Sequence, residues 1–138
     1  MKKCSLKCSI SFVLAFILLL LVTSVGSAVQ PRYIKIVNLS ATLESISLAG
    51  RATCSSLVSI LDATCSVTIT AELQQSGDGT SWDTIKTWSS SGNRTAETAG
   101  YWYVDKGYGY RVLATATVYN SSGNIVETAS ATSLVREY

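Results

Sequence analysis

From residue 33 onward, apolar and polar residues alternate in short segments, and no long segment has the spacing of an amphipathic helix. The clearest segment spans 65–75, where four apolar residues alternate with Ser, Thr and Glu: Val67, Ile69, Ala71 and Leu73. Because successive side chains of a strand point to opposite faces, this alternation predicts a half-buried strand. The chain holds seven such segments, separated by clusters of Gly, Asn, Asp or Ser: 33–48, 51–60, 65–75, 82–89, a segment ending at 101–104, 110–118 and 125–135.

The first segment changes phase along its length. Ile34 and Ile36 alternate cleanly with their neighbours, whereas Leu43 and residues 46–48 fall out of phase with each other. A change of phase within one strand indicates a bulge or a switch between two sheets. We therefore expect an irregularity in the second half of this strand.

The connections between the segments are short and rich in turn-forming residues. Loops are predicted at 76–81 and 89–93, and a hairpin turn at 120–124, where Gly123 supplies a positive φ. Seven strands in about 110 residues, with a turn every 8–12 residues, are typical of an immunoglobulin-like sandwich. The expected fold is a seven-stranded antiparallel immunoglobulin-like β-sandwich, and a small β-barrel is the alternative.

The first 28 residues have a different character. A basic start precedes an apolar run over 10–22 and a stretch of small and polar residues over 23–28. This order predicts a signal peptide helix over 1–28, cleaved after Ala28, and a secreted β-sandwich domain over 29–138. The alternative is a retained membrane anchor, because an apolar span needs about 20 residues.

Composition narrows the possible functions. The chain has 138 residues, a formal net charge of +2 and no histidine, so the commonest general base and metal ligand are missing. After cleavage, 8 Lys and Arg and 9 Asp and Glu remain, which gives a net charge of −1. We expect no enzymatic activity, no cofactor or metal, no nucleic-acid binding and, once the signal is removed, no membrane binding.

Two cysteines remain after signal cleavage, Cys54 and Cys65. In an oxidising compartment they are expected to form a disulfide, which would stabilise the fold by about 3 kcal/mol in the chain-entropy model. A simple hairpin between the second and third strands would instead keep them too far apart. Two separately buried thiols are therefore the alternative.

The aromatic residues give the best candidate for a ligand-binding site. Tyr101 and Tyr103 point to the opposite face from Trp102. If Trp102 belongs to the core, Tyr101 and Tyr103 are exposed, and exposed aromatic rings suit sugars and peptides. The alternative is that they only build a tyrosine-rich sandwich. Asp78 is expected to cap its own turn and Trp82 to pack in the core, with a sugar-binding turn as the alternative.

Several short motifs resemble a family of small secreted proteins from Gram-positive bacteria that is known only as a domain of unknown function. They are spread over nearly all of the mature chain: 50–54, 73–75, 78–82, 85–89, 106–112, 118–123 and 127–128. The resemblance implies an extracellular β-sandwich without a known enzyme activity, and it supplies no catalytic residue.

The resemblance to true immunoglobulin domains is weaker. Cys54 lies where the cysteine of the second strand would be, but the sixth strand has no cysteine to pair with it. Tyr108 or Tyr110 is expected to form a tyrosine corner.

The expected function is that of a secreted, non-enzymatic extracellular structural or interaction module, whose partner is a cell-wall glycan or an extracellular protein. The alternative is a carbohydrate-binding module that uses Tyr101, Tyr103 or the tryptophans of the fourth strand. Thr-rich edge strands, such as 128–134, are expected to suit strand addition by a partner.

Overall fold

A computed structural model describes residues 35–138 of the chain. The expected signal peptide, its helix and the cleavage site after Ala28 lie outside the described residues. The described residues form eight strands: β1 (Ile36–Ile46), β2 (Arg51–Ile60), β3 (Ser66–Ser76), β4 (Asp83–Gly92), β5 (Thr95–Tyr103), β6 (Gly109–Tyr119), β7 (Ile125–Thr132) and β8 (Arg136–Glu137). Within residues 35–138, no helix is long and apolar enough to cross a membrane.

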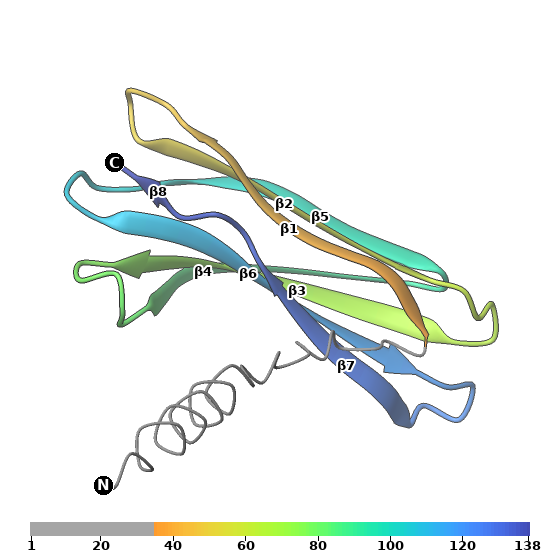
Figure 1. The fold of residues 1–138 in the computed structure, drawn as a ribbon. Coiled ribbons are helices and arrows are strands. Elements are labelled where there is room, and N and C mark those ends of the chain that lie inside the picture. Colours follow the sequence, from red (N-terminus) through yellow and green to blue (C-terminus); the bar gives the residue numbers. More distant parts are fainter. Residues whose placement is uncertain (1–34) are drawn as a thin grey trace, which may run out of the picture. The chain divides into compact units, whose positions relative to one another are not determined.

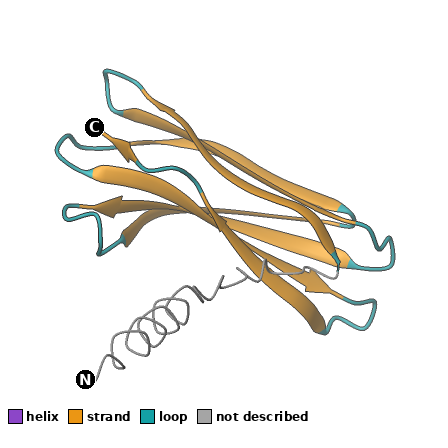
Figure 2. Cartoon of the chain, in the orientation of Figure 1, coloured by secondary structure: helices purple, strands orange, loops and turns teal. Residues whose placement is uncertain are grey.

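The strands form two antiparallel sheets that face each other as a β-sandwich (Figures 1 and 2). One sheet has the order β1-β2-β5, and the other has the order β4-β3-β6-β7, with the short β8 also paired to β6. Grouping strands 1, 2 and 5 against strands 3, 6 and 7 is the immunoglobulin-like arrangement, and here the fourth strand joins the second sheet. The all-β sandwich expected from the sequence is confirmed, and β8 is an addition to the seven expected strands.

Alternating side chains from both sheets fill the core. In β2, β3 and β6 nearly every second residue is buried, as the period-two pattern of the sequence predicts. The buried residues form two clusters along the sandwich. One is centred on Val58, Val67 and Ile69, and the other on Leu73, Tyr110 and Val112.

The phase change expected in the first strand is a bulge. The pairing of β1 with β2 shifts between Leu43 and Ser45, and a second shift lies between Ile36 and Asn38. An extra residue in one strand moves the following side chains to the opposite face. The bulge thus explains why Leu43 and Ile46 differ in phase in the sequence.

The prediction of a loop over 89–93 is wrong in its extent, because β4 continues to Gly92. The serine hydroxyls of this stretch reach hydroxyls of β3: Ser91 lies 2.9 Å from Thr68, and Ser89 lies 3.1 Å from Thr70. Serine is common in loops, but here it belongs to the polar outer face of a sheet. The turn that follows is short and leads directly into β5.

The tyrosine corner is formed by Tyr110, not by Tyr108. Tyr110 is fully buried at the start of β6, and its hydroxyl donates a hydrogen bond to the carbonyl of Asp105 at 2.7 Å. A tyrosine that bonds back to the backbone at this corner is a hallmark of immunoglobulin-like sandwiches. Val112, two residues later, occupies the place of the missing second cysteine.

Candidate functional site

The exposed aromatic residues lie at the end of β5, the outer strand of its sheet. Tyr103 pairs with Arg51, and Tyr101 pairs with Thr53, while the intervening Trp102 pairs with the buried Ala52. Tyr101 and Tyr103 therefore point to the outer face of the β1-β2-β5 sheet, where they are 52% and 63% exposed. The expected exposure of both tyrosines is confirmed.

Trp102 does not belong to the core, so the condition from which the exposure of the two tyrosines was inferred is not met. It faces the side on which the core lies, yet it is 42% exposed. Among the described strands, none of its sheet lies beyond β5 to cover the ring. Its face is instead covered by Lys86 of β4, whose amino nitrogen lies 4.6 Å from the ring centroid.

The two tyrosine rings do not form a flat platform. Their centroids are 6.1 Å apart and their planes are nearly perpendicular, at 85°. The guanidinium of Arg51 lies 4.1 Å from the centroid of the Tyr101 ring and occupies one of its faces. We call this cluster of exposed aromatic and basic side chains the β5 surface; it consists of Arg51, Lys86, Tyr101, Trp102 and Tyr103.

The tryptophans near β4 are only partly buried. Trp82 precedes β4 and stacks with Arg111 at 4.1 Å, so its expected place in the core is wrong. The reason is that pairing with β3 begins only at Asp83, which leaves Trp82 outside the strand. Trp88 packs on the backbone of Gly100 in β5, where a Cβ atom would lie 2.3 Å from the indole nitrogen.

Asp78 caps its own turn, as expected. Its carboxylate accepts hydrogen bonds from the backbone N–H groups of Thr80 and Ser81, both at 2.8 Å, and from the hydroxyl of Ser76 at 3.0 Å. These donors, led by Ser81 and Thr80, hold the pKa of Asp78 well below its usual range. The contacts of this carboxylate stabilise the turn itself.

The structure does not bring Cys54 and Cys65 together, and both are free, buried thiols. They belong to different core clusters. Cys54 lies six residues before the end of β2 at Ile60, which is about 20 Å of extended chain. A disulfide needs Cα atoms about 4.4–6.8 Å apart, so the expected bond is replaced by the alternative of two separate thiols. Burial raises the pKa of the Cys54 thiol to about 12.

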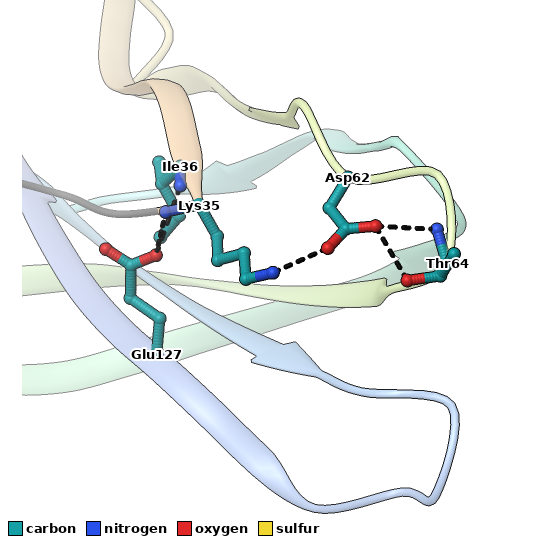
Figure 3. Close-up of polar contacts among 5 residues, drawn as sticks. All are labelled: Lys35, Ile36, Asp62, Thr64 and Glu127. Carbon is teal, nitrogen blue, oxygen red and sulfur yellow. Dashed lines mark hydrogen bonds and ion pairs between the residues drawn. The ribbon is translucent and has the colours of Figure 1, made fainter.

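A polar cluster that the sequence did not suggest joins three segments near the start of β1 (Figure 3). Glu127 of β7 accepts hydrogen bonds from the backbone N–H groups of Lys35 and Ile36, at 2.7 and 3.1 Å. The Lys35 side chain pairs with Asp62 at 2.5 Å, and Asp62 also accepts two bonds from Thr64. Lys35 and Thr64 hold the pKa of Asp62 below its usual range. This cluster fastens β1 to β7 at the end of β2 opposite the β5 surface.

A shallow groove of about 260 Å³ lies between β1 and the segment before β8. It is lined by Ala41, Thr42, Leu43, Ser133, Leu134 and Arg136. Arg136 closes one part of the groove, because its guanidinium donates a hydrogen bond to the carbonyl of Leu43 at 2.7 Å. None of the aromatic residues of the β5 surface takes part in this groove.

Comparison with known protein families finds no family that matches this chain, and a search of curated proteins finds no match either.

Proposed function

We propose that this chain is a secreted, non-enzymatic protein that acts as an extracellular interaction module and binds a protein partner through the β5 surface. The observation that carries the proposal is the exposure of Tyr101, Trp102 and Tyr103 beside the stacked cations Arg51 and Lys86. The resemblance of the sequence to small secreted proteins of Gram-positive bacteria supports the extracellular location.

The composition of the β5 surface favours a protein partner. Tyr, Trp and Arg are the residues most enriched among those that dominate binding energy at protein interfaces. Large aromatic side chains gain contact area at a small entropic cost, and the stacked cations keep donors free for polar contacts. Three adjacent large side chains that stay exposed at the end of one strand therefore suit burial against another macromolecule.

The cation–aromatic stacks weaken the case for a sugar. Residues 35–138 contain four such stacks: Arg51 on Tyr101, Lys86 on Trp102, Lys106 on Tyr138 and Arg111 on Trp82. About one or two are expected in a chain of this size. A polysaccharide chain would need open, roughly coplanar ring faces, whereas here cations lie over Tyr101 and Trp102 and the two tyrosine rings are perpendicular.

Carbohydrate binding is the second candidate function. Tyr103 is the most exposed of the three aromatic residues, and none of the four stacked cations lies over its ring. A single open ring beside Arg51 and Thr53 suits one terminal sugar better than an extended chain.

The experiment compares residues 29–138, which contain all eight strands and both core clusters, with the variant Y101A/Y103A. Each is incubated with insoluble polysaccharides, with isolated peptidoglycan and with surface proteins of the producing cells. The variant T115A/T117A, on the outer face of the other sheet, is the matched control.

Capture of a surface protein by the parent and by T115A/T117A, but not by Y101A/Y103A, is the expected result. Retention on a glycan that only Y101A/Y103A loses would instead favour the second candidate. Equal binding by all three proteins would show that the β5 surface is not the site.

A further inference from the structure

We propose that the partner of the β5 surface is a second copy of this chain, which pairs with it through the free edges of the two β5 strands. The pairing is antiparallel and two-fold symmetric, and it joins two three-stranded sheets into one continuous sheet. This inference rests on the proposed function, because it names the partner of the same surface.

The first step is that β5 has a free edge, and the hydrogen bonds to β2 show which of its residues direct their N–H and C=O groups toward that edge. Within residues 35–138, β5 pairs only with β2, and the register is unbroken from Thr95 to Tyr103. The carbonyl of Arg94 accepts a hydrogen bond from the N–H of Ile60 at the end of β2. The N–H of Val104 donates a hydrogen bond to the carbonyl of Gly50, just before β2. Antiparallel partners alternate in hydrogen bonding, so the even-numbered residues of β5 bond to β2. The odd-numbered residues direct their N–H and C=O groups away from the sheet: Thr95, Glu97, Ala99, Tyr101 and Tyr103.

The second step is that one register uses all of these groups. With Ala99 on the two-fold axis, Ala99 faces its own copy, Glu97 faces Tyr101, and Thr95 faces Tyr103. Each of these is a hydrogen-bonded pair of odd-numbered residues, so every free N–H and C=O group of the edge gains a partner. Any other symmetric register leaves the ends of the edge unpaired.

The third step is charge complementarity on the outer face of the sheet. Glu97 and Tyr101 both lie on this face, opposite Leu57 and Thr53 of β2. Arg51 is stacked on Tyr101, and within residues 35–138 neither Arg51 nor Glu97 has an oppositely charged partner. In the proposed register Glu97 faces the Tyr101 that carries Arg51 of the other copy. Two equivalent Glu97–Arg51 pairs therefore form across the axis.

The fourth step concerns apolar burial. On the core side of the same register, Trp102 faces Ala96 of the other copy, and Thr98 faces Gly100. Residues in such non-hydrogen-bonded pairs come closest to each other, so Trp102 of one copy lies beside the buried Ala96 of the other.

The fifth step compares the edges of the sandwich. Edges that avoid pairing carry charged side chains, proline or bulges. Both β1 and β4 contain bulges in their pairing, and β7 carries Glu127, which is bound to the start of β1. β5 has no proline and no register shift, and its one charged side chain, Glu97, gains a partner in the proposed register. It is therefore favoured over 128–134, the edge expected from the sequence.

The test is sedimentation velocity of residues 29–138 over a wide concentration range, with four variants. E97R and R51E each place like charges at the axis, and the double variant E97R/R51E restores the pairing with the charges exchanged. A99P removes one N–H that points away from β2, so the sandwich keeps its own ladder. Circular dichroism and thermal unfolding check that each variant folds.

The expected result is a concentration-dependent dimer of the parent, weakened about tenfold or more by E97R, R51E and A99P. The double variant E97R/R51E is expected to recover most of the parent's dimer affinity. A parent that stays monomeric, or a dimer that all four variants leave unchanged, would overturn the inference. A monomeric chain that still captures a surface protein through Tyr101 and Tyr103 would overturn only this inference and leave the proposed function standing.

Discussion

Two serine residues show how the surroundings of a hydroxyl decide its effect on stability. Ser56 is buried on the core side of β2, and its hydroxyl has no hydrogen-bond partner among the described residues. The hydroxyl of Ser133 accepts from the N–H of Val112 at 2.8 Å and donates to the carbonyl of Leu134 at 2.9 Å. A buried polar group without a partner costs about 1–3 kcal/mol, whereas a satisfied hydrogen bond contributes about 1 kcal/mol.

The variants S56A and S133A are therefore expected to change the free energy of unfolding in opposite directions. S56A should leave the free energy of unfolding unchanged or raise it by about 1 kcal/mol, because it removes an unpaired buried group. S133A should lower it by about 1 kcal/mol or more, because it leaves the Val112 N–H without its acceptor. Urea unfolding of both variants measures this, and a large loss of stability in S56A would contradict the structure.

The lowered pKa of the Asp78 carboxyl makes the stability of the fold depend on pH. Backbone donors from Ser81 and Thr80 lower the pKa of its carboxyl in the folded state. A lowered folded pKa gives stability that is present above the unfolded pKa, about 3.9, and is lost as the pH falls toward the folded pKa. The parent should lose stability on acidification below about pH 4.

In D78N this part of the acid dependence should disappear. Asp62 still contributes, because Lys35 and Thr64 lower its pKa in the same direction. Unfolding free energies at a series of pH values from 7 to 2 compare D78N with the parent. Equal slopes for the two proteins would show that the turn does not hold this carboxylate.

At the scale of elements, the contact between β4 and β5 is unusually close at one glycine. A Cβ atom on Gly100 would lie 2.3 and 2.6 Å from two atoms of the Trp88 indole. G100A should therefore displace Trp88 and destabilise the sandwich by about 1–3 kcal/mol. G77A is the matched control, because a Cβ there meets only an ordinary contact at 3.6 Å. Tryptophan fluorescence and urea unfolding follow both variants, and a neutral G100A would contradict this packing.

The strands with regular alternation were well predicted from the sequence. Apolar residues at every second position gave 51–60 the same bounds as β2, and 65–75 lies within one residue of β3 at each end. The bulge in β1 was also visible, because it changes the phase of Leu43 against Ile46. These features are local, so the order of residues along the chain is enough to predict them.

The errors arose where neighbouring strands decide the environment. The serine-rich stretch 89–93 predicts a loop, because the partners of Ser89 to Ser91 on β3 are remote in sequence. Trp82 is large and apolar, which favours a place in the core, yet it lies outside the end of β4 and stays partly open. Trp102 is exposed because it lies on an outer strand. The Glu127 cluster depends on contacts across more than 90 residues and left no local pattern.

At the scale of the whole molecule, the ends of the sandwich have different chemistry. The start of β1 is fastened by Lys35, Asp62 and Glu127, whereas the opposite end of β2 carries the β5 surface. The expected signal peptide would precede the fastened end, and its removal would leave a domain beginning at Val29. Intact-mass measurement of the protein recovered from culture medium should give residues 29–138. Recovery of the protein from the cell membranes instead, with a mass that includes residues 1–28, would favour the retained anchor.

The central claim is that the β5 surface is covered by a partner outside the cell. Hydroxyl-radical labelling tests it by comparing the protein in the intact culture with the dilute purified domain. The account predicts that Tyr101, Trp102 and Tyr103 are labelled strongly in the dilute domain and protected in the culture. Ile125 and Leu134, exposed elsewhere on the sandwich, should be labelled equally in both. Equal labelling of residues 101–103 in the two samples, or protection confined to another face, would contradict it.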